Sequence, residues 1–259
     1  RPAASDTASP SPPPDCWRLA DCQVALPPRF TLSTEAKPVR DAATILLLRP
    51  AEPELEVFMV RRGKTAQFMA HAMVFPGGRL DEADCSDAIA ARCDLSRDAA
   101  GALLGLDGAR ALGLLVAGAR ETFEEAGVLL ASKAGVPVDL ADPTVCARFE
   151  TARAGLNDKS LSFEAFLEAE DLRLDVGAIH YSARWITPPI ERRRYDARFF
   201  ITRAPEGQDA LHDDIENSAS DWLGPKTALK AYEAGEIQLA PPTIRVLMGL
   251  AEAGSIEAA

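Results

Sequence analysis

The sequence predicts an α/β fold built around one sizeable core. Three observations support this prediction: residues 43–48 form an aliphatic run of strand length, residues 112–126 carry apolar side chains at helical spacing, and strand-like segments return after that helix. With 259 residues, 47% of them hydrophobic and 26% charged, the chain has the composition of a globular protein large enough to bury such a core.

Residues 1–38 are expected to form a flexible tail ahead of a domain at residues 39–259. The tail holds a proline-rich run at residues 10–14 and shows little apolar periodicity. Because the chain begins with Arg1 and not with methionine, a targeting segment could have preceded it. No apolar run is long enough to span a membrane, so we expect no membrane partner.

Three strands are expected before the helix. Residues 43–48 suit a buried strand, residues 55–60 alternate as a second, and residues 73–75 form a third that leads into Gly77 and Gly78. Glycine at these two positions would let the backbone come close to a ligand.

The helix that ends before Gly127 places three carboxylates on one side. At about 100° per residue, Glu124 and Glu125 lie on either side of Glu121, opposite the apolar face, and Arg120 projects to the side. Carboxylates three and four residues apart repel each other, and the helix dipole is negative at this end. A bound Mg²⁺ or Mn²⁺ would offset both effects, since these cations prefer oxygen ligands. The alternative is a solvated acidic face.

The two ends of this stretch resemble the Nudix box, the metal-binding motif of hydrolases that cut nucleoside diphosphates linked to another group. Gly78 matches the first glycine of the motif, and its second half is matched residue by residue by Arg120, Glu121, Glu124, Glu125 and Gly127. There are departures: Asp84 stands where the family has Glu, and Thr122 where it has an aliphatic residue. Asp84 would act through water or by pairing with Arg120. Between the halves, residues 85–119 form a spacer of 35 residues, much longer than is usual in the family.

A box split in this way is similar to that of the peroxisomal coenzyme A diphosphatases, and the resemblance extends over residues 40–250. It implies a three-layer α/β/α sandwich with a mixed sheet, a box insertion at about residues 85–108 and an added helical lobe at about residues 140–176. A short helix capped by Ser96 is expected in the insertion. The elements expected after the box are a strand at 128–130, helices at 143–154 and 161–172, strands at 179–186 and 194–202, and a helix at 226–234.

The resemblance also implies metal-assisted hydrolysis of a phosphoanhydride, with Mg²⁺ or Mn²⁺ as cofactor. The implied metal ligands are the carboxylates of Glu121, Glu124, Glu125 and Glu216 and the main-chain carbonyl of Gly78. Glu121 is either a ligand or the base toward the attacking water, Glu124 is central to catalysis, and Arg120 orients a glutamate.

Three residues are candidates for binding the substrate. Guanidinium groups hold phosphates in a two-pronged fashion, which suits Arg62 and Arg194, the last of the basic run at residues 192–194. Tyr195 would stack on a base. The alternative is a solvated loop around Arg62 and, at residues 192–195, a strand edge kept from aggregating by its charge.

The substrate class is left with several alternatives. The split box favours coenzyme A or acyl-CoA, while ADP-ribose or a dinucleotide fits nearly as well. A non-catalytic domain that senses nucleotides would typically lose box carboxylates, and this chain keeps Glu121, Glu124 and Glu125. An allylic-diphosphate isomerase would need a catalytic cysteine that the sequence does not place.

The net charge and the cysteine content limit the kinds of binding partner and the cellular compartment that we expect. The net charge of −11 argues against nucleic acid, whose binders carry a basic face. Five cysteines without a CxxC pair indicate reduced thiols in a cytoplasmic protein. The expected partner is a nucleotide-type small molecule, and the sequence leaves open whether the chain forms homo-oligomers.

Overall fold

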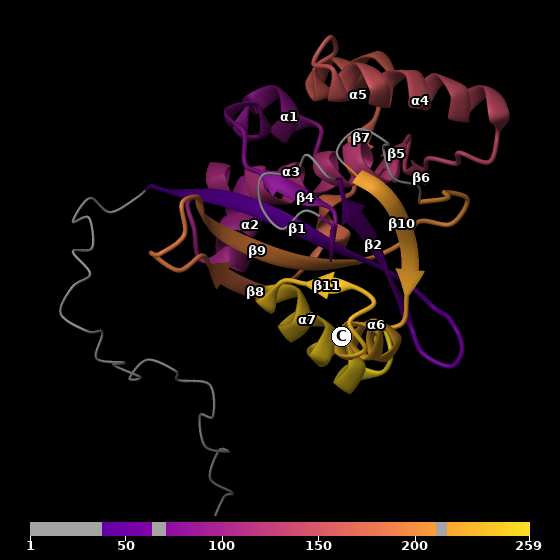
Figure 1. Ribbon diagram of the computed structural model, residues 1–259. Coiled ribbons are helices and arrows are strands. Elements are labelled where there is room, and N and C mark those ends of the chain that lie inside the picture. The colour runs from indigo at the N-terminus through magenta and orange to yellow at the C-terminus, as the bar shows by residue number, and fades with distance from the viewer. Residues whose placement is uncertain (1–37, 64–70, 211–216) are drawn as a thin grey trace, which may run out of the picture. The chain divides into compact units, whose positions relative to one another are not determined.

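The computed structural model describes residues 38–63, 71–210 and 217–259 (Figure 1). The predictions made for the proline-rich tail and for Glu216 therefore lie outside the described residues, as do residues 64–70 on the approach to the glycine loop.

A mixed sheet of eight strands forms the centre of the domain. Its main path runs β11-β3-β2-β1-β9-β8, with β10 paired to β2 and β4 paired to β1. Strand β1 runs parallel to β9 and antiparallel to β2 and β4. The strands are β1 (Val39–Arg49), β2 (Glu56–Arg62), β3 (Ala72–Val74), β4 (Gly77–Arg79), β8 (His180–Ile186), β9 (Arg194–Arg203), β10 (Asn217–Leu223) and β11 (Gln238–Leu239).

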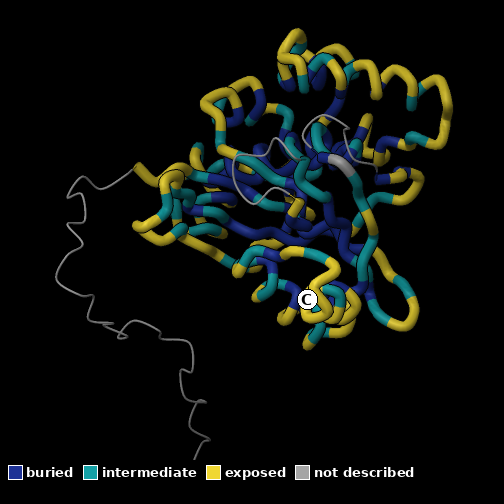
Figure 2. Tube along the Cα trace, in the orientation of Figure 1, coloured by how far each residue is buried: buried dark blue, intermediate teal, exposed yellow. Residues whose placement is uncertain are grey.

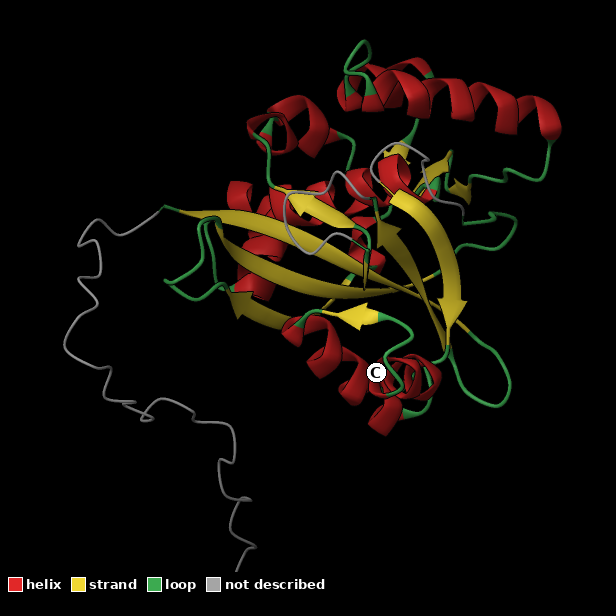
Figure 3. Ribbon diagram, in the orientation of Figure 1, coloured by secondary structure: helices red, strands yellow, loops and turns green. Residues whose placement is uncertain are grey.

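Helices cover both faces of this sheet (Figure 3). Alternate residues of β1 point to opposite faces, so Ile45 packs in the core under α3 (Gly108–Ala126) while Leu46 packs in a second core under α6 (Pro225–Glu233) and α7 (Pro241–Ala253). Figure 2 shows the buried chain concentrated between these layers. The predicted α/β/α sandwich is confirmed.

The segment between the box halves is helical, with a 3-10 turn at Glu82–Cys85, α1 (Asp87–Ala91) and α2 (Arg97–Leu104). Ser96 caps α2 as predicted, its hydroxyl accepting a hydrogen bond from the amide of Ala99 at 3.2 Å. In the described part of the chain no single helix is long and apolar enough to cross a membrane; α2 and α3, bent by 88°, meet that criterion only when taken together.

The helical lobe comprises α4 (Pro143–Asn157) and α5 (Phe163–Ala169), which lie together above α3 in Figure 1. A small sheet of β5 (Ala131–Lys133), β6 (Val136–Pro137) and β7 (Arg173–Leu174) accompanies it. Phe123 of α3 stacks on Phe166 with ring centroids 5.2 Å apart and meets Phe149 edge-on at 6.4 Å. Aromatic packing therefore joins the lobe to the helix that carries the acids.

The box insertion and the lobe bind each other directly. The hydroxyl of Ser86 donates to Glu164 at 3.1 Å, and the amide of Leu174 donates to the carbonyl of Arg92 at 2.7 Å. The amide of Asp94 returns a bond of 3.0 Å to the carbonyl of Leu174. The two additions thus form one continuous layer beside α3.

The strand predicted at residues 128–130 is wrong. These residues are buried, but β5 begins only at Ala131. The main chain of Leu129 bonds to a side chain instead of a strand: its amide donates to Gln208 Oε1 at 2.8 Å, and its carbonyl accepts from Gln208 Nε2 at 3.1 Å. The sequence of a buried aliphatic run does not show whether its backbone hydrogen bonds go to a neighbouring strand or to a side chain.

Candidate active site

Helix α3 has clear limits at both ends. The carboxylate of Asp107 accepts hydrogen bonds from the amides of Ala109 and Arg110 at 3.1 and 3.2 Å, which caps the first turn. Gly127 ends the helix with φ at 69°, the left-handed conformation predicted for it. The acids Glu121, Glu124 and Glu125 therefore lie in its last two turns.

Arg120 lies at the centre of the acid cluster. Its Nε and Nη2 donate to the two oxygens of Asp84 at 2.9 and 3.1 Å, and its Nη1 donates to Glu121 at 2.9 Å and Glu124 at 3.0 Å. Nη2 also donates to the carbonyl of Arg79 at 3.1 Å. The expectation that Arg120 projects to the side is wrong, because the guanidinium turns back into the cluster. Of the two roles considered for Asp84, the structure shows the pairing with Arg120.

The glycine loop faces the same turns of α3. The amide of Gly77 donates to Glu125 Oε2 at 3.0 Å. The carboxylate of Glu121 lies directly against the backbone of Gly78, so closely that a side chain at position 78 would overlap it. Strand β4 is in turn fixed by pairing Gly78 with Ala43 of β1. The two halves of the split motif, far apart in sequence, are thus brought together.

Burial and charge shift the titration of this cluster. Burial raises the pKa of Glu121 to about 7, against the lowering effect of Arg120, and burial likewise raises the pKa of Glu124. Burial alone would lower the pKa of Arg120, but its hydrogen bond with Asp84 and the surrounding carboxylates raise it above the ordinary value. The site therefore resists holding all its negative charge on protein groups alone, and a cation would reverse that preference.

A family model described as the NUDT19 Nudix domain matches residues 105–250, more than half of the chain. The chain belongs to the Nudix hydrolase family. It is 28% identical to the acyl-coenzyme A diphosphatase NUDT19 of Gallus gallus over 84% of this chain and 69% of that protein, and 24% identical to the Xenopus laevis protein of the same name over 73% and 58%. The crystal structure of a Nudix hydrolase from Alicyclobacillus acidocaldarius superposes with a TM-score of 0.70 at 29% identity, covering 86% of this chain and 96% of that one.

Membership makes the chain a hydrolase of phosphoanhydrides in nucleoside diphosphate derivatives. Nudix hydrolases generally use divalent metal ions. Within the described ranges, no three acidic, histidine or cysteine side chains are grouped closely enough to hold one as they stand. The oxygen donors of the cluster nonetheless suit a hard cation. One carboxylate oxygen of Glu121 and one of Glu124 both accept a hydrogen bond from Nη1 of Arg120, so the two oxygens already face the same positive charge.

Two of the three candidate substrate residues bond to the connection between β8 and β9. Arg194 donates to the carbonyl of Thr187 at 3.0 Å, and the amide of Tyr195 donates to the hydroxyl of Thr187 at 3.1 Å, so both close the connection between β8 and β9. Arg194 is in register with Val39, four residues along β1 from the partner of Gly78, a distance of about 13 Å. Arg62 ends β2, with an Nε that is buried and lacks a hydrogen-bond partner among the residues described.

The sequence did not predict the buried position of Arg198 beside the strand that pairs with the glycine loop. It is in register with Ala43, as is Gly78, and its buried Nη1 lies 3.6 Å from both Asp41 and Asp196. A signal existed in the alternation of β9, which places residue 198 on the same face as the buried residue 200. The sequence did not show which strand would lie beside β9.

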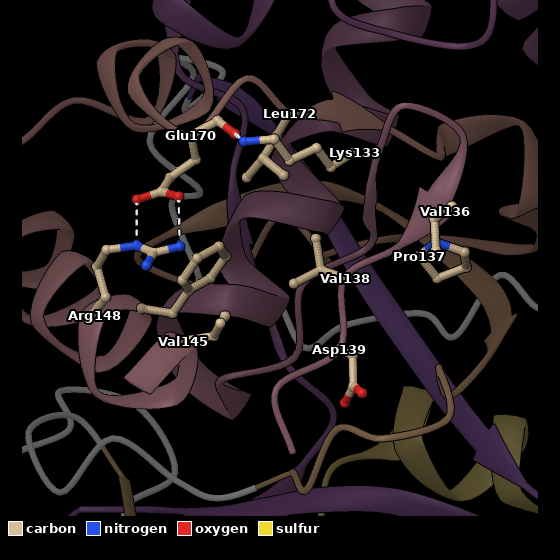
Figure 4. Close-up of a pocket in the computed structure, with 10 residues that line it drawn as sticks. Lys133, Val136, Pro137, Val138, Asp139, Val145, Arg148, Glu170 and Leu172 are labelled. Carbon is tan, nitrogen blue, oxygen red and sulfur yellow. Dashed lines mark hydrogen bonds and ion pairs between the residues drawn. The ribbon is translucent and has the colours of Figure 1, made fainter. Parts of the chain in front are cut away.

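A hollow of about 310 Å³ lies between α4 and the β5–β6 hairpin (Figure 4). Arg148 closes one side by two hydrogen bonds to Glu170 at 2.7 and 2.9 Å. Its lining is otherwise mostly apolar and includes Phe149, which meets Phe123 on the apolar face of α3. None of the box acids lines this hollow, so it is separate from the acid cluster.

Proposed function

We propose that the chain hydrolyses the phosphoanhydride of coenzyme A or an acyl-CoA, using Mg²⁺ or Mn²⁺ held by Glu121, Glu124 and Glu125. The observation that carries this proposal is the convergence of Glu121 and Glu124 on one nitrogen of Arg120, against the Gly77–Gly78 backbone. The acyl-coenzyme A diphosphatase activity for which the NUDT19 relatives are named supports the coenzyme A class.

The chain's own residues do the positioning. Arg120 holds Glu121 and Glu124 in fixed directions, and Asp84 holds Arg120 by two further bonds. Glu121 serves as ligand or as base toward the attacking water, and the absence of a side chain at Gly78 leaves room for it. When bound, the divalent cation neutralises charge on the diphosphate and lowers the pKa of water.

The Glu124→Gln variant tests this assignment. Amide replacement removes the negative charge but keeps the shape, so we expect metal-dependent hydrolysis to fall by about 100-fold or more. Turnover is measured by chromatography on coenzyme A, an acyl-CoA, ADP-ribose and NADH, each with Mn²⁺ and with a chelator. The matched control is Glu168→Gln, an exposed position on α5, which should keep parental rates.

Three outcomes would count against the proposal. Full Mn²⁺-dependent turnover by Glu124→Gln would exclude Glu124 from the metal site. Preference of the parent chain for ADP-ribose or NADH would replace coenzyme A as the substrate. Micromolar binding of a nucleotide without any turnover would indicate a sensor.

A further inference from the structure

Helix α4 of the lobe contacts the end of α3. Arg153 Nε donates to the carbonyl of Glu124 at 2.9 Å, and Arg153 Nη2 donates to the carbonyl of Glu125 at 2.8 Å. Asn157, one turn later on α4, adds a bond of 3.3 Å from Nδ2 to the carbonyl of Glu124. Arg153 is only 6% exposed. A buried arginine of the lobe thus binds the main chain of two of the candidate metal ligands.

These carbonyls need partners from outside their own helix. The last four carbonyls of an α-helix have no intrahelical donor, and they form the negative end of its dipole. The guanidinium of Arg153 satisfies two of them at once with a rigid fork, which fixes the orientation of both peptide groups. The guanidinium of Arg153 is also positively charged, which is opposite in sign to the carboxylates of Glu124 and Glu125 in the same turn.

The end of α3 is shaped to admit this guanidinium. Gly127 has φ at 69°, and a Cβ built there would lie 3.0 Å from Arg153 Nη1. One turn earlier on α4, Phe149 meets Phe123, the residue just before Glu124. The lobe therefore contacts α3 immediately before and immediately after the turn that carries Glu124 and Glu125.

We propose that Arg153 is a positioning residue, which holds the backbone of Glu124 and Glu125 so that their carboxylates keep the direction that metal binding requires. The inference rests on the proposed function only in that these glutamates bind a divalent cation. It assigns the lobe a part in building the metal site. Groups that orient metal ligands typically contribute 10–100-fold to metal affinity.

The test compares Arg153→Met and Arg153→Lys with the control Arg148→Met. Arg148 is on the same helix, its side chain is 52% exposed, and its guanidinium forms an ion pair with the side chain of Glu170. Mn²⁺ affinity is measured without substrate by electron paramagnetic resonance, and amide exchange of the last turn of α3 is followed by mass spectrometry. We expect Arg153→Met to bind Mn²⁺ about 10–100-fold more weakly with faster exchange in that turn. Arg153→Lys, with charge but no fork, should be intermediate, and Arg148→Met should match the parent.

A purely structural role would lower the unfolding temperature of Arg153→Met but leave Mn²⁺ affinity unchanged well below that temperature, which would overturn the inference. If Arg153→Met does not fold, Arg153→Lys and Asn157→Ala decide, and parental Mn²⁺ affinity in both would overturn it. A parent chain that binds no Mn²⁺ would refute the proposed function and this inference with it. Parental Mn²⁺ affinity in a folded Arg153→Met protein would refute the inference alone.

Discussion

Gly78→Ala is expected to lower metal-dependent hydrolysis by about 100-fold or more, although it adds a single methyl group. A Cβ at position 78 would overlap the carboxylate of Glu121. That carboxylate cannot yield freely, because Arg120 holds it by a hydrogen bond of 2.9 Å. Either the Glu121 side chain rotates away or β4 moves. Both changes displace a catalytic group by about 1 Å, and a displacement of that size can lower the rate by about 100-fold.

The effect would be steric and local. Gly78 does not have the positive φ that distinguishes Gly77 and Gly127, so alanine adds no backbone strain there. Gly249→Ala is the matched control, since a Cβ in that exposed turn of α7 meets nothing within 4 Å. Turnover and Mn²⁺ affinity are measured for both variants beside their circular dichroism spectra. A folded Gly78→Ala protein with parental turnover would show that Glu121 is not needed where the structure places it.

The local geometry of the site could largely be predicted from sequence. Helical periodicity placed Glu121, Glu124 and Glu125 on one side of α3, and the resemblance to the Nudix box implied that Gly78 would lie at the same metal site. Both signals come from one helix and one loop. They say nothing about how a long side chain bends, and for that reason the central position of Arg120 was not predicted.

Contacts that depend on tertiary packing could not be predicted. The sequence predicts only that Arg153 lies in a helix, and the docking of α4 is what brings its guanidinium to the carbonyls of Glu124 and Glu125. The order of strands in the sheet, which the sequence also did not predict, decides which basic residues lie near the site. The run at residues 192–194 attracted attention by composition, whereas strand register aligns Arg198, and not Arg194, with Gly78.

Arg120→Met is expected to reduce the free energy of unfolding by about 3–5 kcal/mol and to abolish metal-dependent turnover. Arg120 is 8% exposed, and the Asp84 side chain that receives two of its hydrogen bonds is only 3% exposed. Removing the guanidinium leaves that carboxylate buried without its cation, and it also leaves Glu121 and Glu124 to repel each other. Urea unfolding at neutral pH, in chelator and in Mn²⁺, measures the loss, which the cation should partly restore.

The double variant Asp84→Asn/Arg120→Met separates the causes of this loss. Removing both partners takes away the uncompensated charge, so the double variant should be more stable than Arg120→Met alone. Its turnover should stay low, because Glu121 and Glu124 still lack the nitrogen that orients them. Equal stability of the single and double variants would show that the loss does not come from Asp84. Recovery of turnover in the double variant would show that Arg120 does not orient the glutamates and that its part in the site is confined to neutralising Asp84.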